Sequence, residues 1–372
     1  MADPQPERHL VSHLFNIAMM VFGAVALTWM MHTLGWAKFQ EVVDHVGWAF
    51  LAILGLDLGA VLLDARALHT FMRPEARMVS YWRVVAAQIS GRAVNVVTPF
   101  GALGEATKLT MLISHAPRNR VLSAIVLVNL AALYLSVTVM LIGTPLTLLL
   151  VDLPAELKIT VAVGLAVLVP LMIALGMIVK RGALATLTGV LYRAHVISAA
   201  RRDAWRVRLA EVDRHIAELY KYRSEGTWKG IFWVLASHLV TWFSTMLLIS
   251  AVGVRITPAL VIGVLSVGVL IQWISSVVPL GLGLADGGNY ALYDLLGASG
   301  AHGTFVTMLN RVRSVGVALV GFVVMAIAHT VNRVALARQR RKLRTLKDDL
   351  ALAHPEHAAG EPVAAHDAEP TL

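Results

Sequence analysis

The chain contains 372 residues, of which 57% are hydrophobic and only 15% are charged, and its mean hydropathy is +0.70. Soluble domains are about half apolar and about a quarter charged, so this composition excludes an ordinary soluble protein and favours an integral membrane protein. The chain has no cysteine, which excludes disulfide bonds, thiolate nucleophiles and cysteine-based zinc sites. The net charge of +9 favours a basic cytoplasmic face beside anionic lipid, and we expect no nucleic-acid binding.

Apolar runs long enough to cross a bilayer recur along the chain. A hydrocarbon core about 30 Å thick needs about 20 apolar residues per spanning helix. We therefore expect an all-α, polytopic integral membrane protein of the cell (inner) membrane. The predicted spans are approximately residues 13–34, 46–65, 121–151, 157–179, 229–252, 257–278 and 303–331.

The predicted membrane domain covers residues 13–335. A short tail, 1–12, precedes it, and the segment 336–372 follows it as a basic helix and then a tail with a composition typical of disorder. An insert at 181–228 has apolar residues at alternating steps of four and three. This stripe fits a helix lying on anionic lipid, a helix packed on the ends of the spans, or the surface of a homodimer. Its members are Trp205, Leu209, Val212, Ile216 and Leu219.

The basic residues predict the orientation of the chain. They gather in 66–83, 114–120, 180–229 and 333–347, whereas 35–45, 152–158 and 253–257 carry one each. Cytoplasmic loops are enriched in Lys and Arg, so the four basic regions and both termini are expected in the cytoplasm.

This orientation requires two segments that enter and leave the membrane on the same side. The segment 81–113 joins two cytoplasmic regions, and 257–300 joins two outer ones, so each is expected to form a re-entrant helical hairpin. Proline and glycine near the middle of each hairpin break its helix. The predicted helix breaks are Pro99, Gly101 and Gly104 in the first hairpin and Pro279, Gly281 and Gly283 in the second.

The two halves of the chain have the same order of elements in opposite directions. Residues 46–151 and 229–331 each read as span, hairpin and span. This pattern predicts an inverted repeat, an arrangement that places a binding site near the middle of the bilayer between discontinuous helices.

Polar residues inside these apolar segments are the candidate site. The first hairpin carries Arg92, Asn95, Glu105 and Lys108, and Arg and Lys bind phosphate in different ways, as a planar fork and as a point charge. Charges at this depth cost several kcal/mol, so we expect these residues to line a sheltered route for a polar head group. The alternative is that they only satisfy one another.

A second group of charges lies in the second half. Arg311 and Arg313 lie two to three turns into the last span and form a candidate second phosphate station together with Asp286. The alternative is that the two arginines pair with Asp286 or Asp294.

Asp57 lies near the middle of the second span, between Gly55 and Gly59. It is a candidate charge partner that would neutralise Arg92, carry a coupling proton, or form a structural ion pair with a cation of a hairpin. Asp64 is expected to pair with Arg66 at the level of the lipid head groups. The histidines form no metal-binding motif, so we expect no metal and no cofactor.

At these residues the chain resembles a known family. The stretches "GRAVNVVTPFGALGEATKL" and "SSVVPLGLGLADGGNYALYDLLG", the latter followed by "LNRV", are similar to the two signatures of the lysylphosphatidylglycerol synthase-like transmembrane, or flippase-like, family over roughly residues 12–335. The first signature fits at Arg92, Asn95, Pro99, Gly104 and Glu105, with Lys108 where the family often has Arg. In the second signature, Gly-Gly-x-Gly-x-x-Glu corresponds to Gly281, Leu282, Gly283 and Asp286.

The resemblance implies a module that translocates a lipid or a lipid-linked substrate, without the soluble aminoacyltransferase domain of the bifunctional synthases. We therefore expect a transporter that flips a polar head group, with anionic or lipid-linked membrane lipids as its partners. Two alternatives are a membrane-embedded lipid-modifying transferase and a non-transporting partner of such an enzyme. The sequence has no catalytic motif and no Gly-x-x-x-x-Gly-Lys-Ser/Thr loop, so we expect neither an enzyme nor direct use of ATP.

Overall fold

The structure is a computed structural model that describes residues 46–73, 79–98, 102–150, 224–275 and 283–353, together with single positions between 21 and 214. In the second half, side chains are described for 226–275 and 283–331. The chain divides into two units, Met1–Met325 and Ala326–Leu372. The first unit contains every described residue of the candidate site. In the second unit, the described residues 326–353 are helical.

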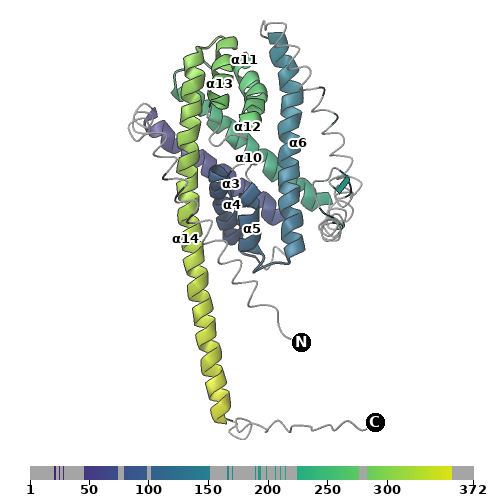
Figure 1. Ribbon diagram of the computed structural model, residues 1–372, viewed down its shortest axis with the longest axis vertical. Coiled ribbons are helices and arrows are strands. Elements are labelled where there is room, and N and C mark those ends of the chain that lie inside the picture. Colours follow the sequence, from purple (N-terminus) through teal and green to yellow (C-terminus); the bar gives the residue numbers. More distant parts are fainter. Residues whose placement is uncertain are drawn as a thin grey trace. The chain divides into compact units, whose positions relative to one another are not determined.

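The secondary structure of the described residues is helical throughout (Figure 1). The elements are α3 (Trp48–Phe71), α4 (Tyr81–Val97), α5 (Ala102–Leu112), α6 (Arg118–Leu150), α10 (Ser224–Ala251), α11 (Pro258–Gly263), the π-helix η3 (Val264–Gly268), α12 (Val269–Ser275), α13 (Leu284–Leu295) and α14 (Gly300–Ala353).

Five helical segments in the described part of the chain are long and apolar enough to cross a membrane: Trp48–Phe71, Arg118–Leu150, Gly226–Ala251, Pro258–Ser275 and Gly300–Val331. They correspond to five of the predicted spans, and they confirm a multi-pass, all-α membrane protein. The tails 1–12 and 354–372 lie outside the described residues, and so do the predicted spans 13–34 and 157–179 apart from a few single positions. So does most of the insert 181–228, whose last residues begin α10.

Both predicted hairpins are interrupted helices. In the first, α4 ends at Val97 and α5 begins at Ala102. In the second, α12 ends at Ser275 and α13 begins at Leu284. Pro99, Gly101, Pro279 and Gly281 lie between these helices but outside the described residues.

The two remaining predicted breaks have different roles. Gly283 immediately precedes α13 with a φ of 81°, a conformation that favours glycine because it has no Cβ. Gly104, in contrast, lies inside α5 and does not break the helix. A Cβ at Gly104 would collide with the carbonyl oxygen of Gly91, so this glycine lets the backbones of α4 and α5 approach closely.

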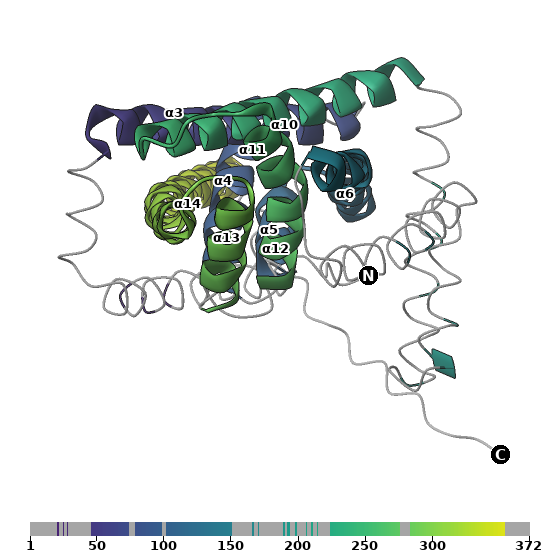
Figure 2. The same ribbon diagram turned by 90° about the horizontal axis from the view of Figure 1, so that it is seen from above.

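α3 and α10 form an antiparallel pair, shown side by side in Figure 2. The Ser237 hydroxyl donates to the Ala60 carbonyl (3.0 Å), and the Ser244 hydroxyl lies 3.4 Å from the Ile53 carbonyl. Hydroxyl groups on apolar helices commonly join helices in this way, because hydrocarbon offers them no other partner.

Two hydrophobic cores hold the helices of the first unit together. One joins the last turns of α3 to the start of α4, the end of α5 and the start of α6, with Val234 of α10. The other joins the first turns of α3 to the end of α10, to α11, to Tyr293 of α13 and to the start of α14. Each core therefore contains one end of α3, residues of α10 and the outer ends of one broken helix pair.

α14 packs against both broken helix pairs in turn. Near its start, Thr307 accepts a hydrogen bond from Asn289 of α13 (2.8 Å). Further on, Val315 and Ala318 pack with Ala93 of α4, and Gly321 is so close to α4 that a Cβ there would meet the Ile89 carbonyl oxygen at 2.6 Å. α13 and α4 thus contact successive stretches of the same helix (Figure 1).

α6, like α14, contacts both broken helix pairs. Its first turns pack with the end of α5. Twenty residues later, Gly143 lies against Ser266 of η3, and the Thr147 hydroxyl is 3.4 Å from that of Ser266. π-helical turns are rare and concentrate at functional positions. In this chain the π-helix η3 lies where the second helix pair contacts α6.

Candidate functional site

The most buried ion pair among the described residues joins α14 to α3. The Arg313 guanidinium donates through two nitrogens to the two carboxylate oxygens of Asp57, which is 3% exposed. The Ser244 hydroxyl of α10 lies 3.0 Å from Asp57, closer than to the Ile53 carbonyl, so its single proton can be donated to Asp57. This fork geometry is the strongest arrangement available to an arginine and a carboxylate, and it ties three helices together at one point.

A second ion pair joins α14 to α13 two residues earlier. Arg311 donates to Asp286 (2.7 Å), and the same carboxylate oxygen accepts the backbone N–H of Gly283 (3.0 Å). Asp286 therefore caps the first turn of α13 while it neutralises Arg311, a position where a carboxylate also interacts favourably with the helix dipole.

The facing ends of the two broken pairs lie at almost the same level of α14. The first turn of α13 contacts Arg311, and the last turn of α4, at Val96 and Val97, packs in the cluster formed by Ala93, Val315 and Ala318. Arg311 and Val315 are one helical turn apart, about 6 Å along the axis. The two arginines thus lie on α14 within about one turn of the stretches that contact the inner ends of α13 and α4.

The first pair carries its own ion pair, between a buried lysine and a partly exposed glutamate. Lys108 is 6% exposed and donates to Glu105 Oε1 (2.8 Å). The other carboxylate oxygen of Glu105 is buried and has no hydrogen-bond partner among the described residues. An unmet buried acceptor costs about 1–3 kcal/mol, more when it is charged, so this oxygen is in an unfavourable state that a further donor or a proton would relieve.

Asn95 connects the two helices of this pair. Its side-chain oxygen accepts the backbone N–H of Gly104 (2.8 Å), which is one of the N–H groups that the first turn of a helix leaves unpaired. The stem of Lys108 lies across Gly91 of α4, where a Cβ would be 2.5 Å from Lys108 Cγ. Glycine at 91 and 104 therefore makes room for the lysine and for the close contact of the two helices.

Arg92 is the most accessible cation of the group. Its side chain is 38% exposed, and its guanidinium lies 3.6 Å from the Asp64 carboxylate of α3. That distance is too long for a direct hydrogen bond, so Asp64 neutralises Arg92 without fixing it.

The structure corrects two of the predicted pairings. Asp57 pairs with Arg313 of the last span and not with Arg92 or another hairpin cation. Asp64 lies beside Arg92, while Arg66 places its guanidinium over the ring of Tyr81, 5.5 Å from the ring centre. Of the two acids considered for the arginines of α14, Asp286 forms a pair.

Sequence reasoning missed Ser244 and the hydroxyl pair Thr147–Ser266. Single hydroxyl residues in apolar helices are common, and nothing in the local sequence distinguishes these three. Among the described residues, no group of three or more His, Asp or Glu side chains could hold a metal ion.

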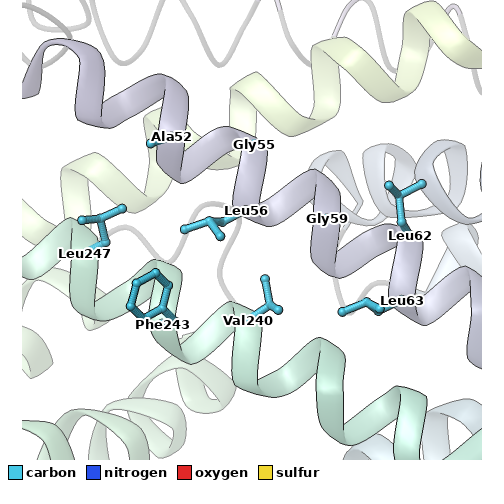
Figure 3. Close-up of a pocket in the computed structure, with 9 residues that line it drawn as sticks. All are labelled: Ala52, Gly55, Leu56, Gly59, Leu62, Leu63, Val240, Phe243 and Leu247. Atoms are coloured by element: carbon cyan, nitrogen blue, oxygen red, sulfur yellow. The ribbon is translucent and has the colours of Figure 1, made fainter.

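A groove of about 710 Å³ runs between α3 and α10 (Figure 3). Its lining is apolar and includes Gly55, Gly59 and Phe243, and Asp57 does not line it. It offers no group that could bind a polar head group, so the charged cluster and not this groove is the candidate site.

The chain was compared with known proteins. Residues 16–321 match the family model described as the lysylphosphatidylglycerol synthase TM region. No curated protein and no solved structure matches the chain.

Proposed function

Because the chain belongs to the lysylphosphatidylglycerol synthase TM region family over residues 16–321, we propose that it flips a lipid, or a lipid-linked polar head group, across the membrane. The observation that carries this proposal is the pair of largely buried arginines of α14, Arg311 and Arg313, each of which forms an ion pair with a carboxylate of another helix. Charged side chains this deep among membrane helices are costly and usually serve transport or binding.

The packing supports an inverted repeat as the framework of this activity. The first repeat would consist of α3, the α4–α5 pair and α6, and the second of α10, the segments α11 to α13, and α14. The two hydrophobic cores occupy equivalent places in the two repeats, because each contains the outer ends of one helix pair and the start of the helix that follows that pair. We propose that the two pairs are re-entrant hairpins that enter from opposite sides.

The sidedness follows from the basic connections. The core at the end of α3 also contains the start of α4 and the start of α6, so the connections 72–80 and 113–117 belong to one end of the first unit. These connections lie in the basic regions of the sequence. We therefore propose that this end faces the cytoplasm, together with both termini.

The proposed route uses cations that are already neutralised. Arg92, Lys108, Arg311 and Arg313 each have a carboxylate partner within 4.0 Å. A phosphate or another anionic head group would replace these carboxylates one after another, so the charge of the lipid would never face hydrocarbon unpaired. Exposure of this route alternately to each side, with the acyl chains remaining in the bilayer, would move the lipid between leaflets.

The direct test is leaflet exchange of head-group-labelled anionic lipid in vesicles that contain the purified protein. We expect exchange with the wild type and an initial rate at least about tenfold lower with Arg92→Ala. This decrease corresponds to an activation barrier that is higher by about 1.4 kcal/mol. The same rate in protein-free vesicles, or no effect of Arg92→Ala, would contradict the proposal. A new covalent lipid species in total lipid extracts would favour a transferase instead.

A further inference from the structure

The groove between α3 and α10 lies on an exposed face of this helix pair (Figure 3). Phe243 and Leu62 of its lining are exposed, and nothing lies within 4 Å of a Cβ placed at Gly55 or Gly59. Both helices are long and apolar enough to cross a membrane, so hydrocarbon surrounds this face. No described residue fills the groove, and its apolar lining requires an apolar occupant.

The groove has about the length of one lipid chain. On α3 it runs from Ala52 to Leu63, which is about 17 Å along the helix axis. The hydrocarbon of one leaflet, half of a core about 30 Å thick, is about 15 Å deep. On α10 the lining runs in the opposite direction, from Leu247 to Val240. One acyl chain can therefore lie along the groove.

A cation lies one turn beyond the Leu63 end of the groove. The lining residues of α3 recur at steps of three and four, and the next step after Leu62 and Leu63 on the same face is Arg66. The Tyr81 hydroxyl donates to the carbonyl oxygen of Leu62 (2.9 Å), and the Arg66 guanidinium lies over the Tyr81 ring, 5.5 Å from its centre. Arg66 is thus joined through Tyr81 to a residue of the groove.

The charge of Arg66 is not compensated within the described part of the chain. The phenol ring of Tyr81 supplies no negative charge, and no described carboxylate lies within 4.0 Å of Arg66, whereas each cation of the charged cluster has such a partner. The exposed Trp82 lies beside Tyr81, with 5.5 Å between the ring centres. Trp and Tyr are enriched where head groups meet hydrocarbon, and arginine binds phosphate through its planar fork.

From these contacts we propose that the groove and Arg66 form a second lipid-binding site, which holds an anionic phospholipid with one acyl chain along α3 and its phosphate at Arg66. The apolar lining binds the chain of any lipid, and the arginine provides the preference for an anionic over a zwitterionic head group. The site is separate from the charged cluster, since Asp57 does not line the groove. It goes beyond the proposed transport and does not depend on it.

The test uses the full-length protein in phosphatidylcholine vesicles that contain a small fraction of photoreactive lipid. This lipid is either phosphatidylglycerol with a photoreactive group at the end of one acyl chain or phosphatidylcholine with the same labelled chain, and peptide mass spectrometry locates the crosslinks. We expect about fivefold more crosslinks from phosphatidylglycerol within 52–63 and 240–247, the effect of one basic residue near anionic head groups. Because the phosphate lies at Arg66, the crosslinks should concentrate near Ala52 and Leu247, at the opposite end of the groove.

Two variants separate the contribution of the charge from that of the groove. Arg66→Gln should reduce the preference to about equal crosslinking by the two lipids. Gly59→Leu should abolish crosslinking of the groove by both lipids, because its side chain would fill the space around Gly59. The exposed residues Arg255 and Val323 provide the controls, since Arg255→Gln and Val323→Leu should behave as the wild type. Size-exclusion profiles check that each variant is folded, and if Gly59→Leu misfolds, Arg66→Gln decides the question.

The outcomes distinguish this site from other occupants of the groove. Equal crosslinking by both lipids in the wild type, or none within the groove, overturns the proposal. A dimer in detergent that Gly59→Leu dissociates also overturns it, because a second copy of the chain would then occupy the groove. A preference for phosphatidylglycerol without leaflet exchange supports this site while the transport proposal fails, and exchange without this preference does the reverse.

Discussion

Each described cation of the site lies beside a carboxylate group. Arg92 faces Asp64, Lys108 faces Glu105, Arg311 faces Asp286, and Arg313 faces Asp57. Removing one partner of a buried pair leaves an uncompensated charge and costs about 3–5 kcal/mol, whereas replacing both partners costs much less. This difference gives a direct test of how tightly the deepest pair is coupled.

Asp57→Asn should destabilise the protein by about 3 kcal/mol, because Arg313 remains charged and buried. Arg313→Gln should have a similar effect for the opposite reason, and the double variant should lose less than the sum of the two single losses. Thermal or denaturant unfolding in detergent measures these differences, with Asp294→Asn as an exposed control. Additive losses would show that the two residues are not coupled.

Glycine 104 is the residue at which a single methyl group should matter most. In Gly104→Ala the new Cβ would collide with the Gly91 carbonyl and the Asn95 side chain, so α4 and α5 must separate. We expect a loss of about 1–3 kcal/mol in unfolding experiments, the usual cost of overpacking.

Gly59→Ala is the matched control, because nothing lies within 4 Å of a Cβ at Gly59 and alanine is the better helix former. Equal effects of the two substitutions would mean that α4 and α5 do not touch at Gly104.

The connection between α5 and α6 contains the one described histidine outside the spans with a clear electrostatic environment. Partial burial lowers the pKa of His115, and the nearby Arg83 lowers it further. Because the folded state disfavours the protonated form, His115 adds stability above about pH 6.5, and this contribution is lost as the pH falls toward its lowered value.

We therefore expect the wild type to lose more thermal stability than His115→Gln between about pH 8 and about pH 5.5. Unfolding curves of both proteins at the two pH values check this. The same loss in both would show that the folded state does not disfavour protonated His115.

Among the elements, those with a strong local signal could be predicted from the sequence. Five apolar runs became helices of the expected type. In the predicted hairpins α4 ends at Val97, and α13 begins directly after Gly283. Bounds were less predictable, since hydrophobicity says little about where a helix ends outside the hydrocarbon. α10 begins at Ser224, before the predicted start at 229, and α3 ends at Phe71, beyond the predicted end at 65.

The pairing of charges could not be predicted in the same way. Asp57 and Arg313 are 256 residues apart, and either could have paired with any opposite charge at its depth. Gly104 looked like a helix break because the sequence shows glycine but not the neighbouring helix that needs the space. The π-helix at Val264–Gly268 also has no local sequence signal, since its apolar residues suit an ordinary α-helix equally well.

For the whole molecule, the central claim is that two interrupted helix pairs enter the membrane from opposite sides and meet at the charged cluster. α6 and α14 each contact both pairs, and they would hold them in register while the route opens to one side and then the other. In this arrangement the two connections that flank one helix pair lie on the same side of the membrane. Ser80 and Ser114 flank the first pair, and Arg255 and Ser299 flank the second.

These four positions are exposed, and the natural chain has no cysteine, so each can carry a single thiol. The decisive measurement is labelling of Ser80→Cys, Ser114→Cys, Arg255→Cys and Ser299→Cys with a membrane-impermeant maleimide in intact cells and in inside-out vesicles. We expect Ser80→Cys and Ser114→Cys to react only from the cytoplasmic side, and Arg255→Cys and Ser299→Cys only from the other. Reaction of Ser80→Cys and Ser114→Cys from different sides would mean that the first pair crosses the bilayer, and the opposed-hairpin account would be wrong.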